Sequence, residues 1–396
     1  MSKIRLEIII LSLNISWFIV IGLITTFVGI HFFNISNGDY FTTGLLSGIP
    51  ALVIIFASFF FGFLVDKFGE KTILTVAFFS ILSANIIYYL ISSSLEFLIV
   101  YIFFSFLTAS YTPSIQKLYS KLSIDRDIFG KLGITTSLGY LIGTLISGSF
   151  YDQYGMEFIF VISGLFSLIG IIGLIPLFVL DDKKSTTLSF IQEDISIKPI
   201  FRKEILIPEI KALYLICISL NFAVGLSSGF YGIFLINELN FAGFTWSLMN
   251  GLATVLGILG SYLIGRYFFG RYQVPLLLSI TGYIIFFLVF SLAENIFIIF
   301  FIYGIPAYVG LMVASPALIT AKIKEKFRGT AMGIAVALQN MGLGFGAILG
   351  GFMGSIFLTF RFNFVLSFIL CFFPLIVTWT LLKTKIELKE EIKVIS

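Results

Sequence analysis

The chain has few charged residues and almost none of the side chains that bind metals. Of its 396 residues, 12% are Asp, Glu, Lys or Arg, against about 25% in an average soluble domain. It has one histidine and two cysteines, Cys217 and Cys371, and both cysteines fall inside apolar runs. This scarcity argues against a soluble enzyme, a disulfide framework and a metal site.

Segments that bind phosphates or activate a nucleophile are not apparent either. No G-x-x-x-x-G-K-[ST] segment occurs, so we do not expect this chain to drive pumping with ATP. We find no His/Cys metal constellation and no nucleophile elbow of a hydrolase. The sequence therefore predicts no catalytic residue, no cofactor and no enzymatic activity. The basic residues are dispersed over many short loops, which does not indicate nucleic-acid binding.

Apolar residues make up 58% of the chain and are gathered into long runs. A run of about 20 apolar residues is long enough to cross the hydrocarbon core of a bilayer. Backbone groups in lipid must be hydrogen-bonded within their own segment, so we interpret the runs as helices. The fold class predicted is an all-α membrane protein with twelve transmembrane helices, at residues 6–32, 42–65, 72–92, 96–117, 131–150, 157–180, 212–236, 245–266, 273–292, 296–320, 329–353 and 361–382.

The distribution of basic residues predicts the orientation of these spans. Of the 25 Lys and Arg residues, all except Arg361 fall on the side of the two termini. Cytoplasmic loops carry the excess of Lys and Arg in membrane proteins. We therefore expect a multi-pass protein of the cell (plasma) membrane with both termini in the cytoplasm.

Several residues of the first half recur in the second half at a constant spacing. Pro113 has its counterpart 203 positions later, at Pro316. The same spacing relates the glycines at 130, 139, 143 and 148 to those at 333, 342, 346 and 351. Parallel repeats of six spans are an established transporter architecture. The domains predicted are an N-terminal six-helix bundle over 1–180, a cytoplasmic linker over 181–210, a C-terminal six-helix bundle over 211–382 and a cytoplasmic tail over 383–396.

Two pairs of these glycines have the spacing that lets helices approach closely. Gly139 and Gly143 are four residues apart, as are Gly342 and Gly346. Two interpretations are open. The glycines serve tight packing alone, or predicted spans 5 and 11 line a seam along which the two halves rock.

A charged loop with glycines joins predicted spans 2 and 3. An aspartate at the membrane edge is costly unless it has a partner. The loop fits the pattern G-x-L-x-D-[KR]-x-G-x-[KR] at every specified position: Gly62, Leu64, Asp66, Lys67, Gly69 and Lys71. This pattern resembles the signature loop between helices 2 and 3 of the major facilitator superfamily, and the resemblance extends over essentially the whole chain.

The resemblance implies two pseudo-symmetric six-helix bundles and a gating role for Asp66. Its carboxylate would lie at the positive N-terminal end of span 11, near Arg328, and would pair with Lys67 or Arg126. Such a contact joins the two halves only when the cytoplasmic side is shut. The alternative is a static helix cap or a loop salt bridge.

Two departures from the family weaken a proton-coupled antiport mechanism. Members that exchange drugs for protons often carry an arginine midway along helix 4, where residues 100–104 here are uncharged. They also carry Gly-Pro within helix 5, where this chain has Gly143-Thr144. Efflux stays open as a direction of transport.

Uncharged polar and aromatic residues within the spans are the candidates to contact a solute. Acidic residues fall at predicted span ends, so a buried charge partner for an ionic solute is missing. The candidates for the substrate cavity are Asn14, Trp17, Tyr140, Asn221, Asn250, Gln339 and Asn340. Hydrogen bonding between helices is the alternative for each amide, and packing is the alternative for each aromatic ring.

Together these features predict a secondary active or facilitative transporter that moves a small neutral or hydrophobic solute by alternating access. The expected partners are a small-molecule solute and the lipid bilayer, with no nucleic acid, and we expect the monomer to be the functional form. The alternative is a transporter-like membrane sensor or lipid-handling protein without solute turnover.

Overall fold

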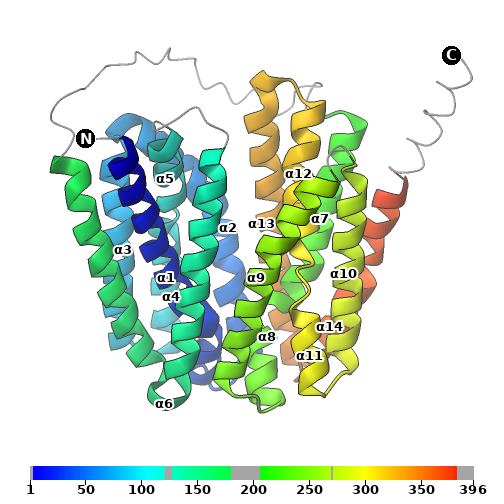
Figure 1. The fold of residues 1–396 in the computed structure, drawn as a ribbon. Coiled ribbons are helices and arrows are strands. Elements are labelled where there is room, and N and C mark those ends of the chain that lie inside the picture. The colour runs from blue at the N-terminus through cyan, green and yellow to red at the C-terminus, as the bar shows by residue number, and fades with distance from the viewer. Residues whose placement is uncertain (1–2, 121–126, 180–205, 269–270, 381–396) are drawn as a thin grey trace, which may run out of the picture. The chain divides into compact units, whose positions relative to one another are not determined.

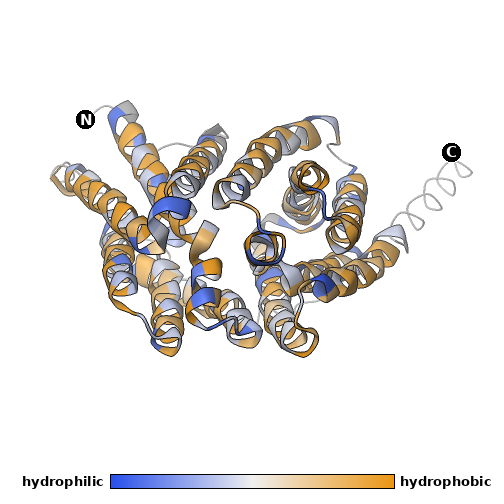
Figure 2. Cartoon of the chain, turned by 90° about the horizontal axis from the view of Figure 1, so that it is seen from below, coloured by the Kyte–Doolittle hydropathy of each residue, from blue (hydrophilic) through white to orange (hydrophobic). Residues whose placement is uncertain are grey.

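The apolar runs of the chain form helices. A computed structural model describes residues 3–120, 127–179, 206–268 and 271–380, and no strand occurs among them. Coloured by hydropathy, the helices are mostly hydrophobic, with hydrophilic residues scattered among them (Figure 2). This pattern is expected of helices whose outer faces contact lipid rather than water.

The described residues of the first half form six helical elements, which are labelled in Figure 1. They are α1 (Lys3–Ile35), α2 (Tyr40–Phe68), α3 (Glu70–Leu90), α4 (Ser94–Thr108), α5 (Tyr111–Ser120) and α6 (Asp127–Val179). The second half contains α7 (Pro208–Ser228), α8 (Tyr231–Ile233), the π-helical segment η2 (Phe234–Glu238), α9 (Gly243–Tyr267), α10 (Gln273–Leu292), α11 (Ile296–Tyr303), α12 (Tyr308–Lys322), α13 (Glu325–Phe357) and α14 (Arg361–Leu370).

Within the described residues, eleven helical stretches are long and apolar enough to span a membrane. One of them, α6, is two helices in sequence. Its 53 residues would extend about 80 Å as a straight helix, far more than the roughly 30 Å of a bilayer core. Gly155, at φ 73°, turns the chain back on itself, and Figure 1 shows the two arms of α6 converging at this turn. The described chain therefore supplies twelve crossings, as predicted.

Four spans predicted to be continuous are interrupted within the described residues, those over 96–117, 212–236, 296–320 and 361–382, and proline explains the first and the last interruption. A proline ring clashes with the carbonyl group four residues earlier in a helix. Pro113 lies four residues after Ala109, where α4 ends, and α5 begins at Tyr111. Pro374 lies four residues after Leu370, where α14 ends before helix resumes over 372–380.

The glycine stripes of the two halves make the same contacts. A methyl group added at Gly139 would overlap the carbonyl oxygen of Ile15 on α1. One added at Gly342 on α13 would overlap the carbonyl oxygen of Ile218 on α7. Both members of the first pair lie 203 positions before their counterparts. Likewise, Gly143 lies against the carbonyl oxygen of Ile19, and Gly346 lies against that of Phe222. Both residues of this contact also recur 203 positions later.

A glycine on α1 also lets the two helices approach closely, this time against the backbone of α6. Gly22 lies against the carbonyl oxygen of Tyr140 on α6, and Gly225 lies against that of Leu343 on α13. These pairs too are related by 203 positions. Two helix pairs, α1 with α6 and α7 with α13, thus repeat one packing pattern. The predicted architecture of two pseudo-symmetric bundles is confirmed.

The chain folds into two compact units whose boundaries do not follow the sequence halves throughout. The first unit comprises Met1–Phe190 and Phe230–Val255, and the second comprises Ile191–Gly229 and Leu256–Ser396. The segment Phe230–Val255, which includes the start of α9, is therefore part of the first unit. Most of the predicted linker 181–210 and all of the tail 383–396 lie outside the described residues.

The glycine contacts lead to a stability prediction. Gly143→Ala should lower the free energy of unfolding by about 1–3 kcal/mol, because a new methyl group must displace the α1 backbone at Ile19. Thermal unfolding of the purified protein in detergent measures this change. Gly133→Ala is the matched control, since an added methyl at Gly133 on α6 meets no atom within 4 Å. Equal melting temperatures for the two variants would contradict the packing role.

Candidate functional site

The aspartate of the signature loop forms an ion pair that the sequence analysis did not identify. Asp66, in the last turn of α2, lies 2.5 Å from the Nζ atom of Lys117 on α5. Lys117 also donates a hydrogen bond to the carbonyl oxygen of Val65 at 3.3 Å. The Asp66 side chain is 71% exposed. A pair this exposed contributes about 0–1 kcal/mol to stability, so stability alone does not account for the aspartate.

The partners predicted for Asp66 lie elsewhere or outside the described residues. The Nζ atom of Lys67 lies 5.3 Å from the centre of the Phe68 ring, an arrangement suited to a cation–π interaction. Arg126 lies outside the described residues. The contact between Asp66 and the start of span 11 would join the two compact units, and it stays a prediction.

The remaining residues of the loop fix its backbone. Gly69 adopts φ 85° between α2 and α3, a conformation that side chains disfavour, and donates its N–H to Val65 at 3.1 Å. Lys71 donates to the carbonyl oxygen of Leu177 in the second arm of α6 at 2.7 Å. Gly62 has open space where a Cβ would lie. The loop is thus attached to α5 and α6.

Two of the predicted cavity residues belong to a packed cluster inside the first unit. Asn14, which is 1% exposed, donates to the hydroxyl oxygens of Thr135 and Thr136 on α6 at 2.9 and 3.0 Å. It also accepts a hydrogen bond of 2.8 Å from the hydroxyl group of Tyr111. The Trp17 ring stacks on Tyr111 at 4.1 Å. Asn14 therefore hydrogen-bonds between helices in this structure, which was the alternative to a solute contact.

A weaker counterpart of this cluster lies in the second unit. Cys217 occupies the position 203 residues after Asn14, and Gln339 occupies that after Thr136. Gln339 donates to the Cys217 sulfur at 3.5 Å. The repeat thus preserves a polar bridge between α7 and α13 while replacing an amide with a thiol.

The other predicted amides hydrogen-bond within their own helices. Each donates to the carbonyl oxygen one turn earlier: Asn221 to Cys217 at 2.8 Å, Asn250 to Trp246 at 2.9 Å and Asn340 to Val336 at 3.0 Å. All three side chains are partly exposed. Tyr140 is half-buried on α6, where its carbonyl group contacts Gly22. The amide oxygens of Asn221 and Asn340 are available to a hydrogen-bond donor.

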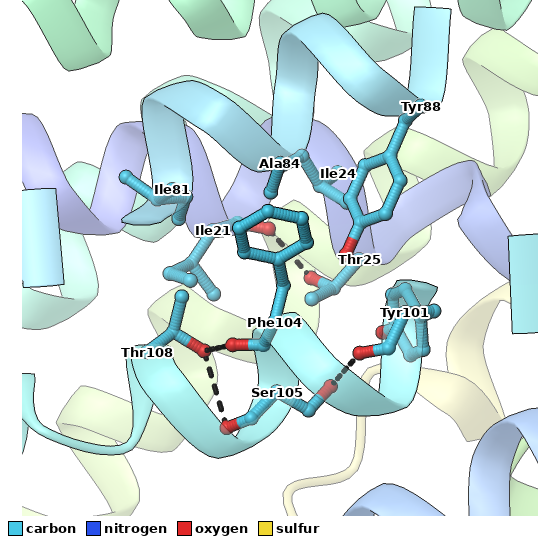
Figure 3. A pocket seen from close by; sticks show the side chains of 10 residues that line it. All are labelled: Ile21, Ile24, Thr25, Ile81, Ala84, Tyr88, Tyr101, Phe104, Ser105 and Thr108. Atoms are coloured by element: carbon cyan, nitrogen blue, oxygen red, sulfur yellow. Dashed lines mark hydrogen bonds between the residues drawn. The ribbon is translucent and has the colours of Figure 1, made fainter. Parts of the chain in front are cut away.

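A small half-open cavity of about 70 Å³ lies within the first unit, between α1, α3 and α4. Figure 3 shows the side chains around it. Its apolar wall is formed by Ile21, Ile24, Ile81, Ala84 and Phe104, and its polar wall by Thr25, Tyr88, Tyr101, Ser105 and Thr108. No residue that lines it is charged.

The Ser and Thr hydroxyl groups that line this cavity are mainly hydrogen-bond acceptors toward its interior. Thr25 donates to Ile21 at 2.8 Å, and Ser105 donates to Tyr101 at 2.7 Å, each within its own helix (Figure 3). Thr108 donates to Phe104 at 2.8 Å in the same way. Because these protons are in use, the hydroxyl oxygens keep lone pairs for a donor. The cavity suits an uncharged group that carries O–H or N–H.

The sequence analysis missed the residues of this cavity, although a signal was present. Tyr101, Ser105 and Thr108 follow one another at spacings of four and three, which places them on one face of α4. None of the predicted cavity residues lines this cavity.

A short Gly- and Ser-containing segment of α7 resembles a catalytic motif of hydrolases in its letters. The sequence analysis found no nucleophile elbow, but residues 225–229 read G-L-S-S-G, which does match the letters G-x-S-x-G of that motif. An elbow requires a sharp turn between a strand and a helix. Ser227 instead lies within α7, fully buried, with its hydroxyl 2.8 Å from that of Ser367. Ser227 therefore packs between helices and does not have the geometry of a nucleophile elbow.

Comparisons with known proteins agree with this fold. A crystal structure of the nucleoside transporter NupG superposes with a TM-score of 0.76 at 14% identity, covering 97% of this chain and 99% of that chain. An inward-facing, unoccupied structure of a bacterial homolog of the human lysosomal transporter Spinster superposes with a TM-score of 0.75 at 16% identity, covering 96% and 98%. At such identities the likeness shows the fold alone.

Sequence comparison identifies the family. No curated protein matches this chain in sequence. The family model described as Major Facilitator Superfamily matches residues 6–313, more than three quarters of the chain. With the signature loop, the twelve crossings and the repeated helix pairs, this match shows that the chain belongs to the Major Facilitator Superfamily of membrane transporters.

Proposed function

We propose that this transporter moves a small neutral or hydrophobic solute across the membrane by alternating access. The observation that carries the proposal is the uncharged cavity between α1, α3 and α4. Within the described spans, charged side chains lie at helix ends or near the turn at Gly155. An ionic solute would lack a buried counter-charge on its path, which is costly in a bilayer.

The chemistry of the cavity narrows the class of solute. Tyr88 and Tyr101 present aromatic rings, while Thr25, Ser105 and Thr108 present hydroxyl oxygens. An uncharged molecule that combines a flat ring with hydroxyl groups fits both kinds of wall. NupG is named as a nucleoside transporter, and nucleosides have this chemistry. Nucleosides therefore enter the solute panel first, followed by neutral amphiphiles.

The proposal includes an orientation and a gate. The charge asymmetry of the loops supports cytoplasmic termini and a place in the plasma membrane. The repeated pairs α1 with α6 and α7 with α13 support a complete transport path in one monomer. Asp66, paired with Lys117 at an exposed helix end, is proposed to engage the second bundle when the cytoplasmic side shuts, and efflux is one direction that this cycle allows.

Counterflow in proteoliposomes tests the proposed transport. Vesicles loaded with an unlabelled solute should accumulate the same labelled solute transiently. Removing two oxygens of the cavity with Thr25→Val and Ser105→Ala should raise the half-saturating concentration by about two- to tenfold per lost hydrogen bond.

Ser149→Ala is the matched control for the cavity variants. Ser149 makes the same bond within its helix, to Leu145 at 2.9 Å, but does not line the cavity. Failure of every solute in the panel to exchange would favour a sensor or lipid-handling protein. Unchanged saturation in both cavity variants would reject this cavity as the solute contact.

The gate is tested by a charge exchange at the ion pair. Asp66→Asn should impair counterflow at least tenfold while leaving membrane insertion intact, because the proposed second contact of the carboxylate is lost. Glu96→Gln is the control and should not impair counterflow. Glu96 is an exposed acid in the first turn of α4, far from the ion pair in sequence. The double variant Asp66→Lys with Lys117→Asp restores the local pair. If it also restored full transport, a static salt bridge would be the whole role of Asp66.

A further inference from the structure

A carboxylate on α6 caps the N-terminus of α9, far away in the sequence. The Asp152 Oδ1 atom accepts a hydrogen bond of 2.9 Å from the backbone N–H of Gly243, 91 positions later. Its Oδ2 atom accepts a hydrogen bond of 3.1 Å from the N–H of Phe244. The first N–H groups of a helix have no partner within the helix, and the positive end of its dipole favours an anion. Asp152 satisfies both conditions at once.

A second hydrogen bond holds the same end of α9 against α1. The indole Nε1–H of Trp246 donates to the carbonyl oxygen of Thr26 at 2.8 Å. Trp246 is 7% exposed, and a buried indole N–H needs such a partner. The start of α9 is therefore attached to both helices of the glycine-striped pair α1 and α6.

Glycine at the first position of α9 is required for this arrangement. A methyl group added at Gly243 would lie 2.5 Å from the Asp152 Oδ1 atom and 3.1 Å from the ring of Phe27. Phe27 in turn stacks on Tyr151 at 4.0 Å, so the ring has little freedom to withdraw. The cap by Asp152 therefore depends on a glycine at position 243, and the surrounding rings leave no room for a larger residue.

The two ends of α9 belong to different compact units. The first unit ends within α9 at Val255, and the second unit resumes at Leu256. A cycle in which the bundles move against each other must therefore either release the start of α9 from α1 and α6 or bend α9. Releasing it breaks the three hydrogen bonds described above and exposes the buried indole ring of Trp246.

We propose that Asp152, Gly243 and Trp246 form a latch, here called the Asp152 latch, that holds one state of the transport cycle. The latch lies at the end of the first unit near the Gly155 turn, which is the outer face under the proposed orientation. In the latched state the carboxylate caps α9 and the indole bonds to Thr26. In the other state all three hydrogen bonds are broken and the start of α9 leaves α1 and α6. The inference rests on the proposed alternating access.

Distance measurements on the full chain in proteoliposomes test the latch. Spin labels at Gln153→Cys and Leu248→Cys, two exposed sites on α6 and α9, report their separation, and both native cysteines are buried. The otherwise unchanged protein should show a short and a long distance. Asp152→Asn should shift the ratio toward the long distance by roughly tenfold, the effect of a lost charge-assisted hydrogen bond.

Variants on the facing helix make the test independent of one substitution. Gly243→Ala should open the latch from the α9 side, and Trp246→Phe should weaken it while keeping the ring. Glu157→Gln, another exposed acid near the Gly155 turn, and Gly265→Ala, a glycine of α9 with open space around it, should leave the distances unchanged.

The outcomes separate the latch from the proposed function. A shift to the long distance in Asp152→Asn and Gly243→Ala, without a shift in the controls, supports the latch even if no solute of the panel is exchanged. Unchanged distances in Asp152→Asn, Gly243→Ala and Trp246→Phe overturn it even if counterflow succeeds. An equal shift in Glu157→Gln also overturns it, because any acid at that end would then suffice.

Discussion

The close approach of α6 to α1, and of α13 to α7, is the constraint on which the rest of the structure depends. In lipid, helices gain little from the hydrophobic effect and associate through backbone proximity and hydrogen bonds. The glycines on α6 and α13 provide that proximity at corresponding positions of the two repeats. The Asn14 and Cys217 bridges lie on the same pairs. Each bundle thus contains one closely packed helix pair, and we expect this pair to stay together while other elements move.

The carboxylates of Asp66 and Asp152 differ in the number and kind of contacts that hold them. Asp66 is exposed and forms an ion pair with Lys117 among the described residues. Asp152 accepts two backbone hydrogen bonds from a helix start whose other end lies in the second unit. Under the proposed alternating access, these two carboxylates would gain and lose their contacts in turn. The positive end of the α9 dipole attracts Asp152, and the proposed gate assigns Asp66 a similar contact with the start of span 11.

Much of the fold could be predicted because its signals are repeated along the chain. Apolar length gave the crossings, basic residues gave the predicted orientation, and the spacing between Pro113 and Pro316 revealed the repeat. The breaks of α4 and α14 were missed, although Pro113 and Pro374 lie four residues beyond them. The site was harder to predict. Whether Asn14 faces a helix or a solute, and whether Asp66 meets Lys67 or Lys117, depends on helix rotation, which composition does not encode.

The central claim is that contacts are exchanged between the two ends of the bundle while the closely packed helix pairs stay together. Hydrogen–deuterium exchange of the protein in lipid nanodiscs, with and without a transported solute, tests it most directly. The amides of Gly243 and Phe244 should change protection in the opposite sense to those of the Asp66 loop, while the amides of α1 opposite Gly143 stay unchanged. Changes of the same sign at both ends, or changes centred on α1, would contradict the account.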